Sequence, residues 1–172
     1  LSTEGNNNND GLTPATAKAT FAKAVATALD GDTIIVADGL YSEAYEIKFE
    51  KLGVVVMAAE GAKPVVQLTG QWTSIILMAT TTFDGITFDG AGIAYYLLSS
   101  KGTDAGTFTF KNCEFTNWDS YWAISNQYSD NTHVKSVVVD NCVFHDATGA
   151  AIHFNENGPR GAHACDNLTI TN

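Results

Sequence analysis

The chain has 172 residues, of which 45% are hydrophobic and 16% are charged, so it is long enough for one domain with a continuous apolar core. A formal net charge of −10 argues against a nucleic-acid partner, which requires a cationic face, and disfavours a strongly polyanionic ligand. No apolar run approaches the roughly 18 residues of a membrane span. The start at Leu1 lacks a secretory signal, as it would in a mature form or an excised fragment.

Residues 1–31 are predicted to form a polar loop and a capping helix. Asn6–Gly11 is rich in loop-forming residues, and Thr13 before Pro14 is a helix-start signal. Thr20 is a second candidate N-cap, and Asp30 with Gly31 is predicted to stop the helix. The apolar stripe of this helix comprises Phe21, Val25, Ala28 and Leu29, with Lys18 and Lys23 directed to solvent.

From residue 32 onward the hydrophobic period changes from about 3.6 to 2, which predicts short β-strands separated by Gly, Asn or Asp. The predicted strands are Thr33–Ala37, Tyr45–Phe49, Gly53–Ala58, Val65–Leu68, Ser74–Met78, Ile86–Phe88, Tyr95–Leu98, Phe108–Phe110, Cys113–Phe115, Trp122–Ile124, Val137–Val139, Cys142–Phe144, Ala150–Phe154 and Leu168–Ile170.

A phrase of alternating apolar residues recurs at intervals of about 27 to 31 residues, the range of repeat architectures. Its copies are Phe83–Phe88, Phe110–Phe115 and Val139–Phe144, and it begins again at Ile170. Each copy is a strand, a polar corner and a second strand, which predicts one coil of a parallel β-solenoid. A β-sandwich also has many short strands, but the in-register repeat favours the solenoid.

The polar corner holds an Asn in most copies: Asn112, Asn141 and Asn172, with Gly85 at the matching place. Stacked Asn side chains are expected to exchange amide hydrogen bonds from coil to coil. The same alignment predicts an internal stack of phenylalanines and places two cysteines on neighbouring coils. The stack comprises Phe88, Phe115 and Phe144, and the cysteines are Cys113 and Cys142. With Cys165 the cysteine count is odd, so the disulfide state of all three stays open.

The predicted fold is therefore all-β, a single right-handed parallel β-helix (solenoid) with an N-terminal capping α-helix. The domain covers residues 1–172, with the loop and cap in 1–31 and about five to six coils in 32–172. The sequence stops at Asn172, one strand into a new copy of the repeat. We expect either further coils beyond 172 or another chain to cover this apolar end.

Two stretches carry a resemblance to a known family. Gly5–Thr16 leads through the predicted helix into Gly31–Tyr41, and the Asn-Cys-x-Phe phrase follows in later coils. This order resembles the secreted right-handed β-helix proteins of the pectate-lyase-like superfamily, including the alginate lyase and chondroitinase B type. It is also similar to uncharacterised β-helix proteins of gut Bacteroidetes. The resemblance implies an extracellular or bacterial cell-surface location and a polysaccharide or oligosaccharide partner.

The catalytic part of the resemblance does not carry over. Lyases of this kind use a Lys or Arg base and a calcium ion held by clustered Asp, Glu and Asn residues. The comparable coil, 149–160, shows neither paired outward acids nor a Lys. Catalytic residues therefore stay unknown, and the sequence predicts no metal site and no cofactor. Calcium enters only as the ion that this family would use.

Two groups of residues are candidates for a binding site. The first is aromatic, and its rings either stack on sugars or seal the core where a loop leaves the coil. The second has acid–base potential, against the alternative of ordinary loop polarity. The candidate carbohydrate-binding residues are Trp118, Tyr121, Tyr128, His153, Glu156 and Arg160.

The neighbours of these candidates are assigned structural roles. Alternation with Ile124 points Trp122 into the core, and Trp72 lies in a turn as lid packing. His133 and His145 are expected to face solvent without identified partners.

Three functions follow as hypotheses. The first is polysaccharide binding, which a flat exposed aromatic strip would favour. The second is an active uronate lyase or glycosidase acting through His153, Glu156 or Arg160, which basic groups and acid pairs on one exposed face would favour. The third is a structural or adhesive surface module, which the absence of both features would favour.

Overall fold

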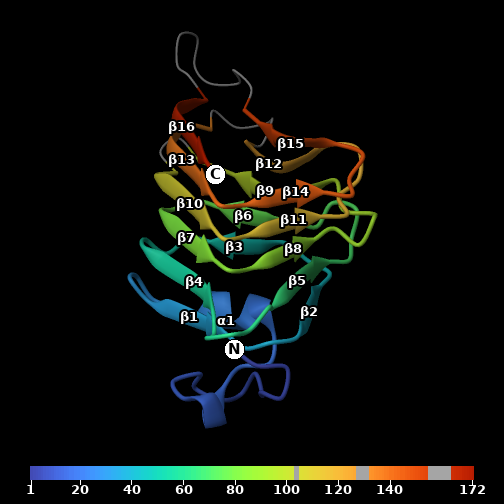
Figure 1. Cartoon of the computed structure of the whole chain (residues 1–172). Coiled ribbons are helices and arrows are strands. Elements are labelled where there is room, and N and C mark those ends of the chain that lie inside the picture. Colours follow the sequence, from blue (N-terminus) through green and yellow to red (C-terminus); the bar gives the residue numbers. More distant parts are fainter. Residues whose placement is uncertain (103–104, 127–131, 155–163) are drawn as a thin grey trace.

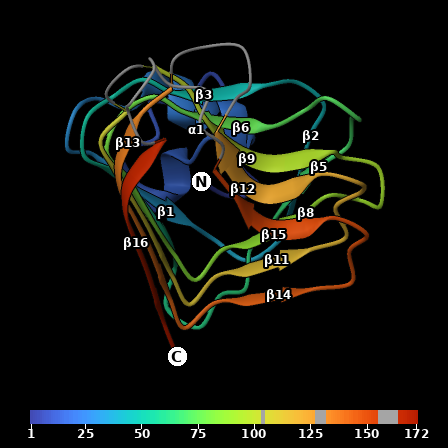
Figure 2. The same ribbon diagram turned by 90° about the horizontal axis from the view of Figure 1, so that it is seen from above.

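The computed structural model describes residues 1–102, 105–126, 132–154 and 164–172, and it shows a parallel β-solenoid (Figure 1). Every coil contributes one strand to each of three parallel sheets, which form three sides of the stack when it is viewed along its axis (Figure 2). Sheet A has six strands and sheets B and C have five each, so the chain completes five coils and enters a sixth. The prediction of an all-β solenoid is confirmed.

The strand bounds are as follows. Sheet A contains β1 (Thr33–Val36), β4 (Val54–Ala58), β7 (Thr81–Asp84), β10 (Thr107–Lys111), β13 (Val134–Asp140) and β16 (Cys165–Thr171). Sheet B contains β2 (Leu40–Glu43), β5 (Val65–Leu68), β8 (Thr87–Asp89), β11 (Glu114–Thr116) and β14 (Val143–His145). Sheet C contains β3 (Ile47–Phe49), β6 (Ile75–Leu77), β9 (Tyr96–Ser100), β12 (Trp122–Asn126) and β15 (Ala150–His153). The sequence had not predicted β2, and it predicted β7 only through the repeat phrase that begins at Phe83, because both are four-residue segments with few apolar side chains.

Helix α1 (Phe21–Thr27) closes the N-terminal end of the stack (Figure 1). The Thr20 side chain accepts a hydrogen bond from the backbone N–H of Lys23, so Thr20 is the N-cap as predicted. Phe21 is fully buried, and its ring centroid lies 6.2 Å from that of Phe49 in β3. The helix ends at Thr27, and Leu29 is therefore 66% exposed. The prediction that Leu29 belongs to the buried stripe is wrong.

Lys18 organises the Asn-rich loop beneath this cap. It was predicted to point to solvent, but it is only 7% exposed. Its ammonium group donates to the carbonyl oxygen of Asn7 at 3.4 Å and to that of Asn9. The loop turns these carbonyl groups inward, where they require a donor, and a lysine supplies up to three. The buried ammonium group therefore fixes the path of the loop that precedes the short 3₁₀ helix η1 (Pro14–Thr16).

The core contains the predicted phenylalanine stack. The ring centroids of Phe88 and Phe115 are 5.3 Å apart, and those of Phe115 and Phe144 are 4.5 Å apart with nearly parallel planes. Phe88 and Phe115 are fully buried, and Phe144 is half-buried in the last complete coil. Because β8, β11 and β14 pair in register, the same residue type recurs on the same inward position of each coil.

The polar corner between sheets A and B forms the expected ladder. Asn112 donates from its side-chain amide to Asp84 Oδ1 at 2.7 Å, and Asn141 donates to Asn112 Oδ1 at 2.7 Å. Gly85, Asn112 and Asn141 have φ values of 71°, 50° and 51°. This left-handed backbone explains the residue choice, because Gly and Asn adopt it more readily than other residues do. The Asn side chains themselves are exposed.

At the opposite end from α1, β16 extends sheet A by pairing with β13. Its apolar side chains Leu168 and Ile170 are 48% and 62% exposed. The expectation that further coils or another chain cover them stays a prediction. Within the described ranges, neither the length nor the apolar character of any helix is sufficient for crossing a membrane.

Candidate functional site

Aromatic side chains gather at the turn that leads from sheet B into sheet C. Trp72 lies just before β6, Tyr95 and Tyr96 lie at the start of β9, and Tyr121 and Trp122 lie at the start of β12. The turns stack because β9 and β12 pair in register, which places Trp122 opposite Tyr96. We call these five residues the aromatic strip. In the preceding coil, Tyr45 lies just before β3 and is 84% exposed.

The rings of the aromatic strip form one continuous series across three coils. The Trp72 and Tyr95 centroids are 4.8 Å apart, and those of Tyr95 and Tyr121 are 5.0 Å apart. Tyr96 stacks on Tyr121 at 5.2 Å and lies 5.6 Å from Trp122. Such contacts restrain the rings, so the strip is preorganised before any ligand arrives.

The strip is open to solvent. Trp72 is 62% exposed and Tyr121 is 36% exposed, while Tyr95, Tyr96 and Trp122 are half-buried. Trp72 packs on Tyr95 and Tyr96, but its large exposure does not fit the lid role expected for it. The inward orientation expected for Trp122 is also wrong. Strict alternation fails in β12, which buries four consecutive residues, Ala123–Asn126, after the partly exposed Trp122.

His153, a predicted site residue, extends the strip toward the last complete coil. It lies in β15, and its imidazole stacks on the Trp122 indole with the centroids 4.0 Å apart and the planes 6° from parallel. Tyr121 is the other predicted residue found in this series. The structure thus brings Tyr121 and His153 together through Trp122.

Trp118 is buried and does not belong to the aromatic strip. It is only 3% exposed, and its ring lies 6.5 Å from that of Phe144 in a perpendicular arrangement. The next coil covers it closely: a Cβ atom on Gly149 would lie 2.9 Å from Trp118 Nε1 and 2.1 Å from the carbonyl oxygen of Tyr121. The prediction that Trp118 presents its face to a glycan is wrong, because Gly149 lets the last complete coil close over it.

Three predicted site residues, Tyr128, Glu156 and Arg160, lie outside the described residues. Their assignment to carbohydrate binding stays a prediction, and so does the pairing of His153 with Glu156 or Arg160.

The sequence did not predict that His145 lies between two carboxylates. His145 Nε2 lies 2.8 Å from Glu114 Oε1 on the adjacent strand, and Nδ1 lies 2.7 Å from Asp146 Oδ2. Hydrogen bonding to Asp146, and then to Glu114, raises the pKa of His145. His145 was expected to lack partners, yet aligning the phrases Asn112–Thr116 and Asn141–His145 would have placed Glu114 and His145 on the same outer face of sheet B.

His133 likewise has a partner on a neighbouring coil, since its Nε2 lies 2.9 Å from Asp166 Oδ1. His133 directly precedes β13 and Asp166 lies in β16, and these two strands pair in register. The expectation of a histidine without partners is therefore wrong here too.

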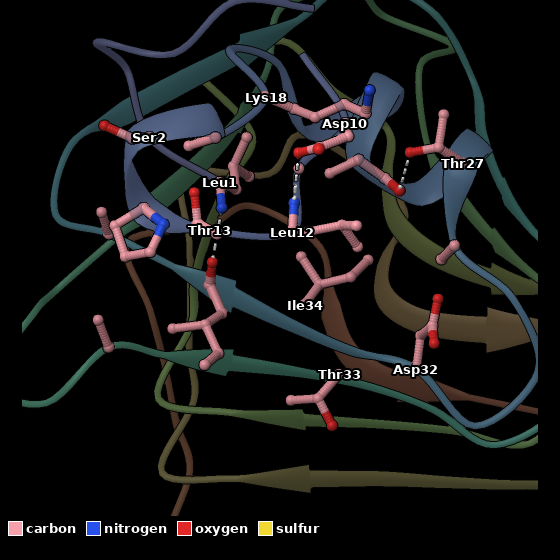
Figure 3. A pocket seen from close by; sticks show the side chains of 18 residues that line it. Leu1, Ser2, Asp10, Leu12, Thr13, Lys18, Thr27, Asp32, Thr33 and Ile34 are labelled. Carbon is pink, nitrogen blue, oxygen red and sulfur yellow. Dashed lines mark hydrogen bonds between the residues drawn. The ribbon is translucent and has the colours of Figure 1, made fainter.

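A hollow of about 520 Å³ lies between the N-terminal segment and β1, and no residue of the aromatic strip lines it (Figure 3). Apolar side chains such as Leu12 and Ile34 form much of its wall. Polar groups around it bond to nearby backbone: the Leu1 amino group donates to Ile35 O at 2.8 Å, and Asp10 accepts from Leu12 N–H at 3.0 Å. These bonds use the groups that would otherwise orient a ligand, so we assign no chemistry to this cavity.

Across the described ranges, no group of three or more His, Cys, Asp or Glu side chains is arranged to hold a metal ion. No protein-family model matches the chain, and no curated protein matches it either. We therefore infer function from the geometry of the aromatic strip and of His145 with its partners Glu114 and Asp146.

Proposed function

We propose that this protein binds polysaccharide along the aromatic strip, as an extracellular β-solenoid of the pectate-lyase-like type. The observation that carries the proposal is the continuous series of rings over three coils, with Trp72 62% and Tyr121 36% exposed. Sugar rings present apolar C–H faces that pack against aromatic faces. Rigid aromatic side chains offer large contact areas at little cost in rotamer entropy.

The direction of the strip favours a polymer over a single sugar. Neighbouring strands in a sheet lie ~4.8 Å apart, so rings on successive coils extend the strip along the solenoid axis. Trp72, Tyr95 and Tyr121 come from three successive coils and contact one another in that order. A glycan chain lying along the axis would contact several rings at once. After the first contact, each further contact would cost the ligand little additional translational and rotational entropy.

The local charge favours an uncharged glycan. Asp119 precedes Tyr121 by two residues, and hydrogen bonds from the hydroxyl groups of Thr148 and Ser120 lower the pKa of its carboxyl group. Asp119 is therefore ionised at neutral pH beside the strip, in a chain of net charge −10. A polyuronate would be repelled by this field, whereas a neutral polysaccharide would not.

Affinity electrophoresis tests the proposal. The protein is run through gels that contain a neutral glucan, xylan or mannan, or a polyuronate. We expect retardation by at least one neutral polymer. Retardation should fall sharply in Trp72→Ala and Tyr121→Ala, and the thermal unfolding midpoint should change little. Leu52→Ala is the control, because Leu52 is 60% exposed but lies outside the strip. Equal retardation of all three variants would contradict the role of the strip.

Glycan cleavage is a second candidate, favoured by the arrangement of Glu114, His145 and Asp146 on an exposed face of sheet B. Two carboxylates beside a histidine provide proton-transfer groups of the kind that glycosidases and lyases use. Incubation with neutral and uronate polymers, with and without calcium, would reveal unsaturated products by ultraviolet absorbance or new reducing ends. Activity abolished by His145→Ala would support this candidate. Retardation without either product would leave binding alone.

A further inference from the structure

Cys113 and Cys142 occupy equivalent positions on two neighbouring coils. Cys113 directly precedes β11 and Cys142 directly precedes β14, and these strands pair with Glu114 opposite Val143. The backbone N–H of Val143 donates to the carbonyl oxygen of Cys113 at 3.0 Å. Adjacent strands are ~4.8 Å apart, which falls within the Cα separations of roughly 4.4–6.8 Å found in disulfides. A bond between the two sulfur atoms therefore requires little backbone movement.

Both thiols lie at the end of β10. Cys113 Sγ donates to Lys111 O at 3.1 Å, Cys142 Sγ donates across the coils to Phe110 O at 3.5 Å, and both cysteines are reduced in this structure. Their surroundings differ. Cys113 is 2% exposed within the core, whereas Cys142 is half-buried and belongs to the coil of β14, the edge strand of sheet B. One thiol is therefore accessible to a small reagent, and the other is protected directly behind it.

We propose that Cys113 and Cys142 form a redox-active dithiol, which small-molecule disulfides oxidise to an intramolecular disulfide that joins the last two complete coils. The Cys142 thiolate attacks one sulfur of a disulfide such as oxidised glutathione and displaces one glutathione thiolate. Cys113 then loses its proton and attacks the Cys142 sulfur, which breaks the mixed disulfide and releases the second glutathione. The protein loses two hydrogens and two electrons, and the glutathione disulfide gains them.

The electrostatics agree with these roles. Interaction with the neighbouring Cys113 thiol lowers the pKa of Cys142, which favours the Cys142 thiolate at neutral pH. The same interaction, followed by burial, raises the pKa of Cys113. Cys142 is thus the attacking thiol, and Cys113 reacts only after the mixed disulfide has formed beside it.

Cys165 is too far away to take part. It begins β16 opposite Val134, whereas Thr171 at the other end of β16 lies opposite Asp140, next to the Cys142 corner. A strand rises ~3.3 Å per residue, so the strand from Cys165 to Thr171 spans roughly 20 Å. Cys165→Ser therefore serves as a matched control.

The test is oxidation in glutathione redox buffers, followed by alkylation of free thiols and peptide mass mapping. The wild type and Cys165→Ser should both yield a peptide that links Cys113 to Cys142. Cys113→Ala should stop at a stable glutathione adduct on Cys142. Detection of Cys142 linked to Cys165, or of a reduced Cys113–Cys142 pair in fully oxidising buffer, would overturn the proposal.

Kinetics provide a second readout that does not depend on stability. In Cys113→Ala the pKa of Cys142 should return toward 9.0. At neutral pH the thiolate fraction would then fall more than the intrinsic nucleophilicity rises, so exchange with a small disulfide should slow several-fold. Unchanged or faster exchange in Cys113→Ala would show that Cys113 does not activate Cys142.

Discussion

Replacing Phe115 by alanine tests the repeat register most directly. Phe115 is fully buried, stacks on Phe88 on one side and on Phe144 on the other, and has an edge contact with Phe110 at 5.7 Å. Truncation of a buried phenylalanine costs about 3–5 kcal/mol. With two stacked partners lost at once, we expect a loss of about 4 kcal/mol in the free energy of unfolding.

The same stack supplies the controls. Phe144 is half-buried and has one stacked partner, so Phe144→Ala should cost only about half as much, roughly 2 kcal/mol. Phe115→Leu keeps most of the apolar volume and should cost less than about 1.5 kcal/mol.

Urea denaturation followed by circular dichroism measures these differences. With an m-value near 2–3 kcal/mol/M, the midpoint of Phe115→Ala should fall by about 1.3–2 M. A loss below about 1 kcal/mol for Phe115→Ala would refute the reasoning, and so would equal losses for Phe115→Ala and Phe144→Ala.

Three further substitutions test local features. Asn141 has a φ of 51°, so Asn141→Ala should be less stable than Asn141→Gly by about 1 kcal/mol in chemical denaturation, and equal values would contradict a strained corner. The pKa of His145 is higher in the folded protein than its ordinary value of 6.5, because the protonated imidazole bonds to Asp146 and Glu114. The stabilisation from these bonds is fully present below pH 6.5 and is lost as the pH rises through the pKa of the folded state. The thermal midpoint of the wild type should therefore fall more between about pH 6 and pH 8 than that of His145→Gln, and parallel curves would speak against this linkage. Lys18→Met leaves the carbonyl groups of Asn7 and Asn9 without their donor and should cost about 1–3 kcal/mol, seen as faster proteolysis of the N-terminal loop. The exposed Lys23→Met is the control, and equal proteolysis of the two variants would argue against a structural role for Lys18.

Apart from the capping helix with its N-cap Thr20, the features that sequence predicted correctly follow from the repeat. Phe115 and Phe144 hold the same place in successive phrases, and parallel in-register pairing then stacks them without further information. Asn112 and Asn141 were found in the same way. In a solenoid each coil contacts mainly its neighbours, so aligning the repeats of the sequence predicts which residues contact each other in the structure.

The candidate site was harder to predict because its residues lie where the repeat is least regular. Trp118 and Tyr121 are three residues apart in one turn, yet one is buried and the other is exposed. The difference depends on Gly149 in the next coil, which permits the close approach over Trp118. Alternation could not decide the orientation of Trp122, because β12 buries four residues in a row after it. Such details depend on packing between coils, which composition and period do not specify.

The pairing register also shows where this architecture accepts change. Thr33 pairs with Val55, a separation of 22 residues, whereas Val137 pairs with Leu168, a separation of 31. Along sheet A the interval between paired residues thus grows while the strands stay aligned, so the additional residues fall outside the paired segments. Insertions between strands therefore cost little more than loop entropy, which grows slowly with length. The protein is in this respect a scaffold for loop grafting: a foreign peptide could be displayed on one flank while the ladder of strands beneath it stayed unchanged.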